Sequence, residues 1–330
     1  MLRDGSKSFA AAARLLPREV AQSAIALYAF CRVADDAIDR AGGATALPAL
    51  RDRVHRAYAH RPYPLAPDRA LAWVVARHAI PRALPEALME GFAWDAEGRR
   101  YESLDDVIAY ATRVAGTVGA MMALLMGTRS PAAVARACDL GIAMQLVNIA
   151  RDVGEDARAG RLYLPLSWLR AEGIDVETWL SRPRFSPDLG RVVRRLLDEA
   201  AALFARADGG IARLPAGCRP GIAAARLIYS EIGREVVRHG YDSVSRRAVV
   251  TGRRKLALLA QSVVHALTAR IDEDAPSLPE ARFLLDAVAA APAPPRPVPE
   301  REVARWDARV ERVITMFARL QAEEVARWPS

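Results

Sequence analysis

The 330-residue sequence contains little cysteine, histidine or lysine. Its three cysteines, Cys31, Cys138 and Cys218, are widely separated and odd in number, so a disulfide-bonded extracellular scaffold is not expected. The first residues, Met1 to Lys7, lack the apolar core of a secretory signal. Together these features predict a reduced, cytosolic compartment.

Several motifs that would indicate other chemistry are also missing. The five histidines form no His-Glu-x-x-His pattern, so a zinc hydrolase is not indicated. There is no Walker A loop and no Gly-x-Ser-x-Gly nucleophile elbow. The longest weakly polar run, Val114 to Gly127, has 14 residues, whereas a membrane-spanning helix needs about 20. We therefore expect this run, together with Cys31 and Cys138, to lie in a buried core.

The composition is that of a globular protein, with 52% hydrophobic and 26% charged residues. The net charge is +8, but Lys7 and Lys255 are the only lysines, and arginine supplies the rest of the positive charge. An arginine- and alanine-rich chain is typical of a GC-rich coding sequence, and no RNA-binding motif or zinc finger is present. We expect no nucleic-acid partner; the positive field favours phosphorylated substrates and acidic lipid surfaces.

Apolar residues recur at helical spacing along almost the whole chain, and long alternating runs typical of strands are lacking. The expected helices cover approximately residues 17–38, 49–60, 68–78, 83–97, 104–126, 131–157, 189–208, 219–239, 252–271, 278–290 and 301–327. Because no linker interrupts residues 1–271, the sequence predicts an all-α fold with a single helical domain over this range.

Residues 272–330 differ in composition from the rest. Residues 291–299 read Ala-Pro-Ala-Pro-Pro-Arg-Pro-Val-Pro, which predicts a stiff extended spacer. The helix expected after it has one apolar stripe, consisting of Trp306, Val310, Val313, Phe317 and Leu320. Two interpretations follow: this helix docks on the main domain, or it lies on a membrane surface.

An acidic cluster ends the first expected helix. Asp35, Asp36 and Asp39 follow Tyr28 and Arg32 at spacings of three and four residues, which gives one polar stripe on an otherwise apolar helix. Buried carboxylates at this spacing repel one another unless cations neutralise them. Because Arg32 supplies only one positive charge, the cluster requires another cation.

A second cluster repeats this arrangement on the helix over 131–157. Gln145, Asn148, Asp152 and Asp156 advance by three or four residues, and all of them offer oxygen donors. A sparse set of oxygen ligands suits Mg²⁺, which keeps water ligands and bridges to substrate phosphates. Arg151, next to them, could hold a phosphate oxygen through its planar guanidinium group.

The alternative is that each cluster only joins two helices by salt bridges. Two matching clusters, each with its own arginine and its own amide or phenol, favour a metal–diphosphate site over this alternative.

The chain resembles the squalene and phytoene synthases, and most closely the bacterial phytoene synthases, over about residues 5–260. The blocks that carry the resemblance are Ser6-Lys7-Ser8-Phe9, Ala26 to Arg32, Gly91 to Tyr101, Val114 to Gly119 and Gln145 to Pro165. Thr112 departs from the family, which often has a second tyrosine there, and Ala150 stands where a larger aliphatic residue is common. Both departures are expected to alter the cavity lining.

The resemblance implies a helical bundle of the isoprenoid synthase type with a central cavity. It implies the head-to-head condensation of two geranylgeranyl diphosphates to phytoene through prephytoene diphosphate, a cyclopropyl intermediate, with release of diphosphate. Mg²⁺ is the implied cofactor, Mn²⁺ can substitute for it, and no nucleotide cofactor is expected. Peripheral attachment to the inner face of the cytoplasmic membrane is expected, since a C40 hydrocarbon is not released readily into water.

The resemblance also implies roles for individual residues. The implied metal ligands are Asp35, Asp36, Asp39, Asn148, Asp152 and Asp156. The implied substrate-binding residues are Ser6, Lys7, Ser8, Tyr28, Arg32, Gln145, Arg151, Tyr229 and Arg247. Of these two sets, Tyr28, Arg32, Asp35, Asp39, Asp152 and Asp156 are predicted to be catalytic. Tyr229 could equally be a core residue, and Arg247 could lie on a solvated helix face.

Two other functions stay open. One is a squalene or dehydrosqualene synthase that uses farnesyl diphosphate, a C15 substrate. The other is a non-catalytic helical member of the family, which the complete set of acidic residues disfavours.

Overall fold

The computed structural model describes residues 13, 15–40, 45–271 and 275–292. The side chains of Asp35, Asp39 and Arg40 are not part of that description. Ser6, Lys7 and Ser8, most of the Pro-rich spacer and the helix expected over 301–327 also lie outside the described residues.

The described part of the chain is helical and contains no β-strand, which confirms the predicted all-α class. Its main helices are α2 (Arg18–Arg40), α3 (Leu47–Tyr58), α4 (Ala66–Arg77), α5 (Ala83–Ala96), α6 (Leu104–Ala111), α7 (Thr117–Leu125), α8 (Pro131–Arg158), α9 (Leu166–Ala171), α10 (Val176–Ser181), α11 (Pro187–Ile211), α12 (Arg219–Arg238), α13 (Gly252–Thr268) and α14 (Arg282–Ala290). Short 3₁₀ turns, η3 (Ala216–Cys218) and η4 (Pro279–Ala281), precede α12 and α14.

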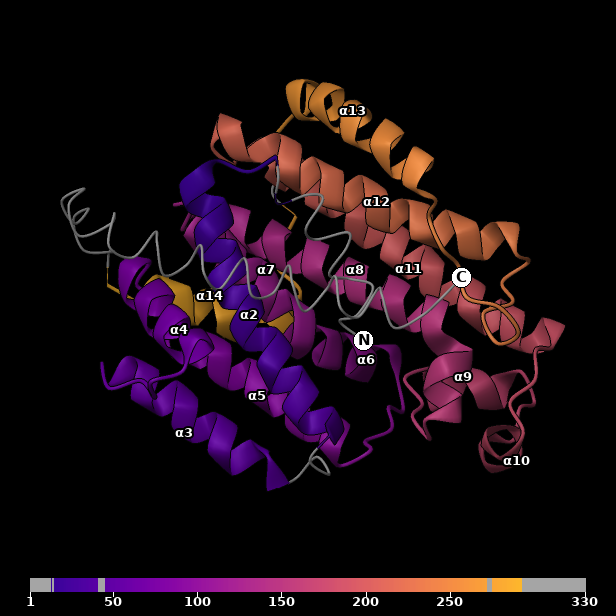
Figure 1. Cartoon of the computed structure of the whole chain (residues 1–330). Helices are drawn as coiled ribbons and strands as arrows, with labels where there is room; N and C mark the ends of the chain where they lie inside the picture. The colour runs from indigo at the N-terminus through magenta and orange to yellow at the C-terminus, as the bar shows by residue number, and fades with distance from the viewer. Residues whose placement is uncertain (1–12, 14, 41–44, 272–274, 293–330) are drawn as a thin grey trace.

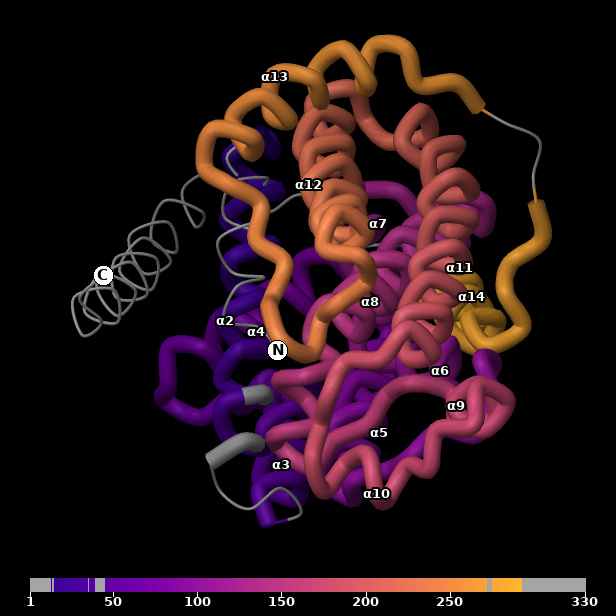
Figure 2. Tube along the Cα trace, turned by 90° about the vertical axis from the view of Figure 1, so that its right-hand side faces the viewer, coloured from indigo at the N-terminus to yellow at the C-terminus, as the bar shows by residue number. Residues whose placement is uncertain are grey.

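Helix α8 is the central helix of the bundle. It packs against α7, α11 and α12, while α2, α3, α4 and α5 form the other side of the molecule (Figure 1). Its start is set locally, because the Ser130 side chain accepts a hydrogen bond from the amide of Ala133 and Pro131 occupies the first turn. Seen from the side in Figure 2, α13 lies at the outer edge of the bundle, beyond α12.

Helices α7 and α8 approach each other very closely. A Cβ atom on Gly119 would overlap the carbonyl oxygen of Ala137, and one on Gly141 would overlap that of Ala115. Only glycine permits this backbone contact. The stretch expected as one helix over 104–126 is interrupted just before the contact by a π-helical turn, η2 (Thr112–Gly116).

Two segments are long and apolar enough to cross a membrane by length and composition, Leu104–Leu125 and Pro131–Arg158. Most of each apolar window is buried inside the bundle, 61% and 72% respectively, as expected for core helices. Cys31 and Cys138 are buried as predicted.

Helix α14 belongs to the region predicted to follow the main domain. Its side chains Leu284 and Val288 are buried in the same core cluster as residues of α2, α4 and α5. This part of 272–330 therefore packs on the bundle, whereas the predicted boundary at residue 271 stays a prediction.

Candidate active site

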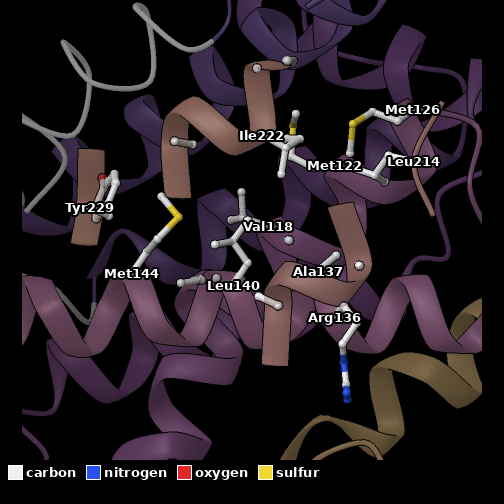
Figure 3. Close-up of a pocket in the computed structure, with 18 of the residues that line it drawn as sticks. Val118, Met122, Met126, Arg136, Ala137, Leu140, Met144, Leu214, Ile222 and Tyr229 are labelled. Atoms are coloured by element: carbon white, nitrogen blue, oxygen red, sulfur yellow. The ribbon is translucent and has the colours of Figure 1, made fainter. Parts of the chain in front are cut away.

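The bundle encloses an apolar cavity of about 230 Å³ between α2, α7, α8, α11 and α12. Its wall consists mainly of alanine, leucine, valine, methionine and glycine. Met122, Met126 and Leu214 lie together at one end, and Tyr229 and Met144 lie toward the other (Figure 3). The cavity is thus an apolar chamber with a polar group at one end.

The polar end is formed by side chains from three helices. Tyr28 from α2, Gln145 and Asn148 from α8, and Tyr229 from α12 all line the cavity. The Asn148 amide donates a hydrogen bond to Gln145 Oε1 over 3.3 Å. Asn148 Oδ1 is buried and has no hydrogen-bond partner among the described residues, so an oxygen donor is left available at this end.

Thr112 and Ala150, the two departures from the family pattern, do not line this cavity. Both are fully buried, at 0% exposure, in the packing around α8. The expectation that these two residues alter the cavity lining is therefore wrong: their side chains pack within the helical core and do not contribute to the cavity wall.

One turn beyond Asn148 on α8, the carboxylate of Asp152 is held by two arginines. Arg151 donates through Nε over 2.8 Å and through Nη2 over 2.5 Å. Arg247 donates through Nε over 2.7 Å and also lies 3.1 Å from a carboxylate oxygen of Glu155. Arg151 and Asp152 are each only 3% exposed, so this is a buried charge network.

Arg247 lies in the loop between α12 and α13, outside any helix. It is directed at Asp152, which is 95 residues earlier in the chain. The alternative of a solvated helix face is therefore wrong for Arg247: the loop brings its guanidinium group into the second acidic cluster.

Asp156, one further turn along α8, is 8% exposed. Burial, reinforced by the negative charge of Asp152, raises the pKa of Asp156 to about 8. Arg151 and Arg247 hydrogen-bond to Asp152, and the positive charge of Arg161 offsets the effect of burial on Asp156 only in part. Together with the unpartnered Asn148 Oδ1, Asp156 provides the hard oxygen ligands that fit a divalent cation such as Mg²⁺.

The first acidic cluster is described in part. Arg32 forms an ion pair with Asp36, with 3.2 Å between Arg32 Nε and a carboxylate oxygen. The described side chains contain no group of three or more His, Cys, Asp or Glu residues placed to hold a metal. Because Asp35 and Asp39 are not among those side chains, the predicted two-cluster metal site stays a prediction.

A buried tyrosine–aspartate network lies beneath the second cluster, and the residue patterns did not predict it. Asp95 of α5 accepts hydrogen bonds from the hydroxyl groups of Tyr110, over 2.9 Å, and Tyr163, over 2.7 Å. The ring of Tyr101 packs against both tyrosine rings, with centroids 5.2 and 6.1 Å away. The available signal was the aspartate that follows the apolar stretch Gly91 to Trp94, within a block already noted for its resemblance.

This network supports the C-terminal end of α8. The chain segment that carries Tyr163 turns back after α8, and the amide of Arg161 donates a hydrogen bond of 2.8 Å to the carbonyl of Asp156. The negative charge of Asp156 contributes to raising the pKa of Tyr163, after burial and Asp95. The tyrosine network and the second acidic cluster are therefore neighbours.

Comparisons with known proteins identify the family of this chain. The sequence model of the squalene/phytoene synthase family matches residues 2–254. The chain is 48% identical over 340 residues to the phytoene synthase of Cereibacter sphaeroides, covering 98% of this chain and 92% of that relative. It is 52% identical over 298 residues to the phytoene synthase of Rhodobacter capsulatus, covering 88% of each.

Solved structures show the same fold. A dehydrosqualene synthase solved with a ligand is 31% identical, with a TM-score of 0.73, covering 81% of this chain and 94% of that chain. A squalene synthase from Alicyclobacillus acidocaldarius is 24% identical, with a TM-score of 0.64, covering 71% and 89%. The architecture is thus that of the isoprenoid synthases, as predicted.

Proposed function

The chain belongs to the squalene/phytoene synthase family, and we propose that it is a phytoene synthase of carotenoid biosynthesis. The reaction joins two geranylgeranyl diphosphates head to head, through prephytoene diphosphate, to phytoene. Two diphosphate ions leave and two protons are lost. The observation that carries this proposal is the identity of 48% to a phytoene synthase over 98% of this chain.

Metal binding is part of the proposal. Asn148, Asp152 and Asp156 on α8, with Asp35, Asp36 and Asp39 on α2, would hold Mg²⁺ or Mn²⁺. When bound, the metal would neutralise the negative charge that develops on the leaving diphosphate. On both helices the acidic residues follow the residues that line the cavity, Tyr28 on α2 and Gln145 and Asn148 on α8, which supports a diphosphate site at the polar end.

The arginines would position the acids and the diphosphates. Arg151 and Arg247 orient Asp152 through hydrogen bonds. A diphosphate oxygen bound by either arginine would therefore share that arginine with the carboxylate of Asp152. Arg32 and the N-terminal Ser6, Lys7 and Ser8 complete the proposed diphosphate ligands. No residue of this set suggests a nucleotide cofactor.

The cavity would accommodate the hydrocarbon chains and protect the allylic cation. Its apolar wall excludes water, which would otherwise quench the cation as an alcohol. The hydroxyl groups of Tyr28 and Tyr229, which line the polar end of the cavity, would contact the diphosphate or help to steer the cation. Burial raises the pKa of Tyr229, so its hydroxyl stays protonated in the resting site.

Product analysis tests the proposal. Purified protein is incubated with Mg²⁺ and either geranylgeranyl or farnesyl diphosphate, with and without NADPH, and the hydrocarbon is identified by mass spectrometry. Phytoene from the C20 substrate without NADPH is expected. A C30 hydrocarbon formed preferentially from the C15 substrate would favour a squalene or dehydrosqualene synthase, and no hydrocarbon from either would favour the non-catalytic alternative.

The chemistry also bears on location. A C40 hydrocarbon partitions into lipid, so the proposed enzyme would work attached reversibly to the inner face of the cytoplasmic membrane. The predicted contact through the helix over 301–327 lies outside the described residues.

A further inference from the structure

Helix α13 exposes an unusually large amount of apolar surface. Exposed side chains include Leu256 at 70%, Val264 at 61% and Leu267 at 81%, with Val249 before the helix at 64% and Ile271 after it at 61%. Within the helix, the exposed positions Leu256, Val264 and Leu267, with Ala257, Ala260 and Val263, recur at spacings of three, four and seven residues. They form one continuous outward stripe, which we call the α13 stripe.

The orientation of α13 is fixed by its other face. Leu258, Ser262 and Ala266 are buried against α12. Arg254 also donates two hydrogen bonds of 3.0 Å to the carboxylate of Glu231, a residue of α12 that is fully buried. The α13 stripe therefore cannot turn inward without breaking this packing and this ion pair.

The segment that carries the α13 stripe is basic. Residues 243–271 contain no aspartate or glutamate, whereas Asp242 precedes this segment and Asp272, Glu273 and Asp274 follow it. The same segment carries six basic residues, which are Arg246, Arg247, Arg253, Arg254, Lys255 and Arg270. Arg247 and Arg254 pair with Asp152 and Glu231. An apolar stripe on a helix that carries basic residues and no acidic residue of its own is still the pattern of a helix that lies in the headgroup region of an anionic membrane.

We propose that α13 is the membrane-contacting surface of this protein and that its stripe inserts among anionic lipids. This proposal rests on the proposed function in one respect: a membrane contact is useful to an enzyme whose product is a hydrocarbon. Helix α12 supplies Ile222 and Tyr229 to the cavity wall and packs against α13 through its opposite side, so one helix separates the cavity from the proposed lipid contact (Figures 2 and 3).

The α13 stripe could be covered by lipid or by the C-terminal segment of the same chain, and the charges favour lipid. Residues 300–330 contain six arginines and six acidic residues, so this segment carries no net charge to complement the basic flanks. A second copy of the chain would place like basic flanks against each other, which disfavours a dimer through this face. An anionic lipid surface complements both the apolar stripe and the basic flanks.

Vesicle flotation with the full-length protein tests the proposal. The vesicles are phosphatidylcholine with or without phosphatidylglycerol. The first variant is Leu256→Ser/Val264→Ser/Leu267→Ser, and the second is Arg246→Gln/Arg253→Gln/Arg270→Gln. A matched surface control, Tyr63→Ser/Leu65→Ser, changes exposed apolar residues between α3 and α4, and a tail control is Trp306→Ser/Phe317→Ser.

We expect wild type to bind only the anionic vesicles. Because each arginine near an anionic surface contributes about 1 kcal/mol, the arginine variant is expected to bind roughly a hundredfold more weakly. The serine variant is expected to lose more than about tenfold. Circular dichroism and turnover in detergent should stay unchanged in both, since these side chains lie outside the proposed site.

Other outcomes would overturn the proposal. Equal binding by wild type and both α13 variants would remove α13 as the contact, and loss of binding only in the tail control would assign it to the C-terminal segment. If wild type without lipid sedimented as a dimer that the serine variant dissociated, α13 would be a protein–protein interface. Because vesicle binding is measured without substrate, none of these results depends on which hydrocarbon is made.

Discussion

Glu231 and Asp156 are both buried carboxylates on long helices, and their surroundings differ in one respect. Glu231 accepts hydrogen bonds from Arg234, Arg238 and Arg254, and these lower the pKa of Glu231 to about 2, Arg254 contributing most. Asp156 lies beside another carboxylate, and burial raises the pKa of Asp156 to about 8. The carboxylate of Glu231 is thus neutralised by arginines of its own chain, whereas that of Asp156 is not neutralised to the same degree.

This difference separates a structural ion cluster from a functional one. A carboxylate whose partners all come from the protein joins two helices, here α12 and α13. A carboxyl group whose pKa is raised by burial and by a second carboxylate, two helical turns beyond a residue that lines a cavity, is the arrangement expected where a ligand supplies the positive charge. The predictions below test whether this distinction between the two clusters holds.

Substituting Asp156 should have the largest effect. Asp156→Asn keeps the size of the side chain but removes the charge, so we expect turnover to fall by about a thousandfold or more through the loss of charge stabilisation at the leaving group. The thermal unfolding midpoint of the metal-free protein should stay the same or rise, since repulsion from Asp152 is removed. Steady-state kinetics and a thermal melt on one preparation measure both.

Activity near that of wild type in Asp156→Asn would contradict the assignment of Asp156 to the metal. A matched control is Asp188→Asn on α11, which changes a half-exposed carboxylate paired with Arg191 and should leave turnover unchanged.

Substituting Arg151, which binds Asp152 through two hydrogen bonds, should have the second-largest effect. Arg151→Lys keeps the charge but loses the planar pair of donors, so turnover is expected to fall by about a hundredfold and diphosphate binding to weaken. Titration calorimetry with inorganic diphosphate and Mg²⁺ measures the binding. Arg32→Lys, beside the first acidic cluster of Asp35, Asp36 and Asp39, is expected to lower turnover and diphosphate binding in the same way. If lysine restored full activity at both positions while alanine unfolded the protein, both arginines would be structural only.

Glu231 should affect stability and not chemistry. Glu231→Gln is expected to lower the free energy of unfolding by about 2 kcal/mol, the value for a hydrogen bond to a charged group. The cost stays below that of a fully buried pair, because the side chains of Arg234, Arg238 and Arg254 are 56%, 52% and 42% exposed and can be solvated. Urea unfolding gives the free energy, and turnover per folded molecule should match wild type.

The pH dependence of the stability of Glu231→Gln gives a further test of the role of the Glu231 charge. Since the pKa of Glu231 is lowered on folding, its contribution is fully present above the unfolded value of about 4.3 and is lost as the pH falls toward about 2. The unfolding free energies of wild type and Glu231→Gln should therefore converge between about pH 4.3 and pH 2. A constant gap over this window would show that Glu231 does not act through its charge.

The acidic cluster on α8 and the cluster around Glu231 differ in how far the sequence predicts them. The residues of α8 lie at helical spacing, so the face shared by Gln145, Asn148 and Asp152 follows from the sequence alone. The partner Arg247 is 95 residues from Asp152 and reaches it only through the path of a loop, which no local pattern encodes. Glu231 was not recognised because its three arginines are scattered over two helices.

The fold shows the same limit. Long helices were predicted to within a few residues because their apolar periodicity is strong. The short helices α9 and α10 were missed, since six residues hold too few turns to show a period. The π-helical turn η2 takes part in the close contact with α8 through Ala115, and it has no signature in the periodicity.

The smallest expected effects come from removing one arginine of each cluster. Arg234→Gln takes away one single hydrogen bond of 3.1 Å from a 56% exposed side chain, while Arg238 and Arg254 still hold Glu231, so stability should fall by less than about 0.5 kcal/mol. Arg247→Gln leaves Asp152 with Arg151, and turnover is expected to fall about tenfold, because two charge-assisted hydrogen bonds that orient the carboxylate, of 2.7 and 3.3 Å, are lost. Urea unfolding and kinetics on both variants complete the test: a loss of stability without a loss of turnover in Arg247→Gln would place Asp152 with Glu231 as a structural cluster and end the distinction between them.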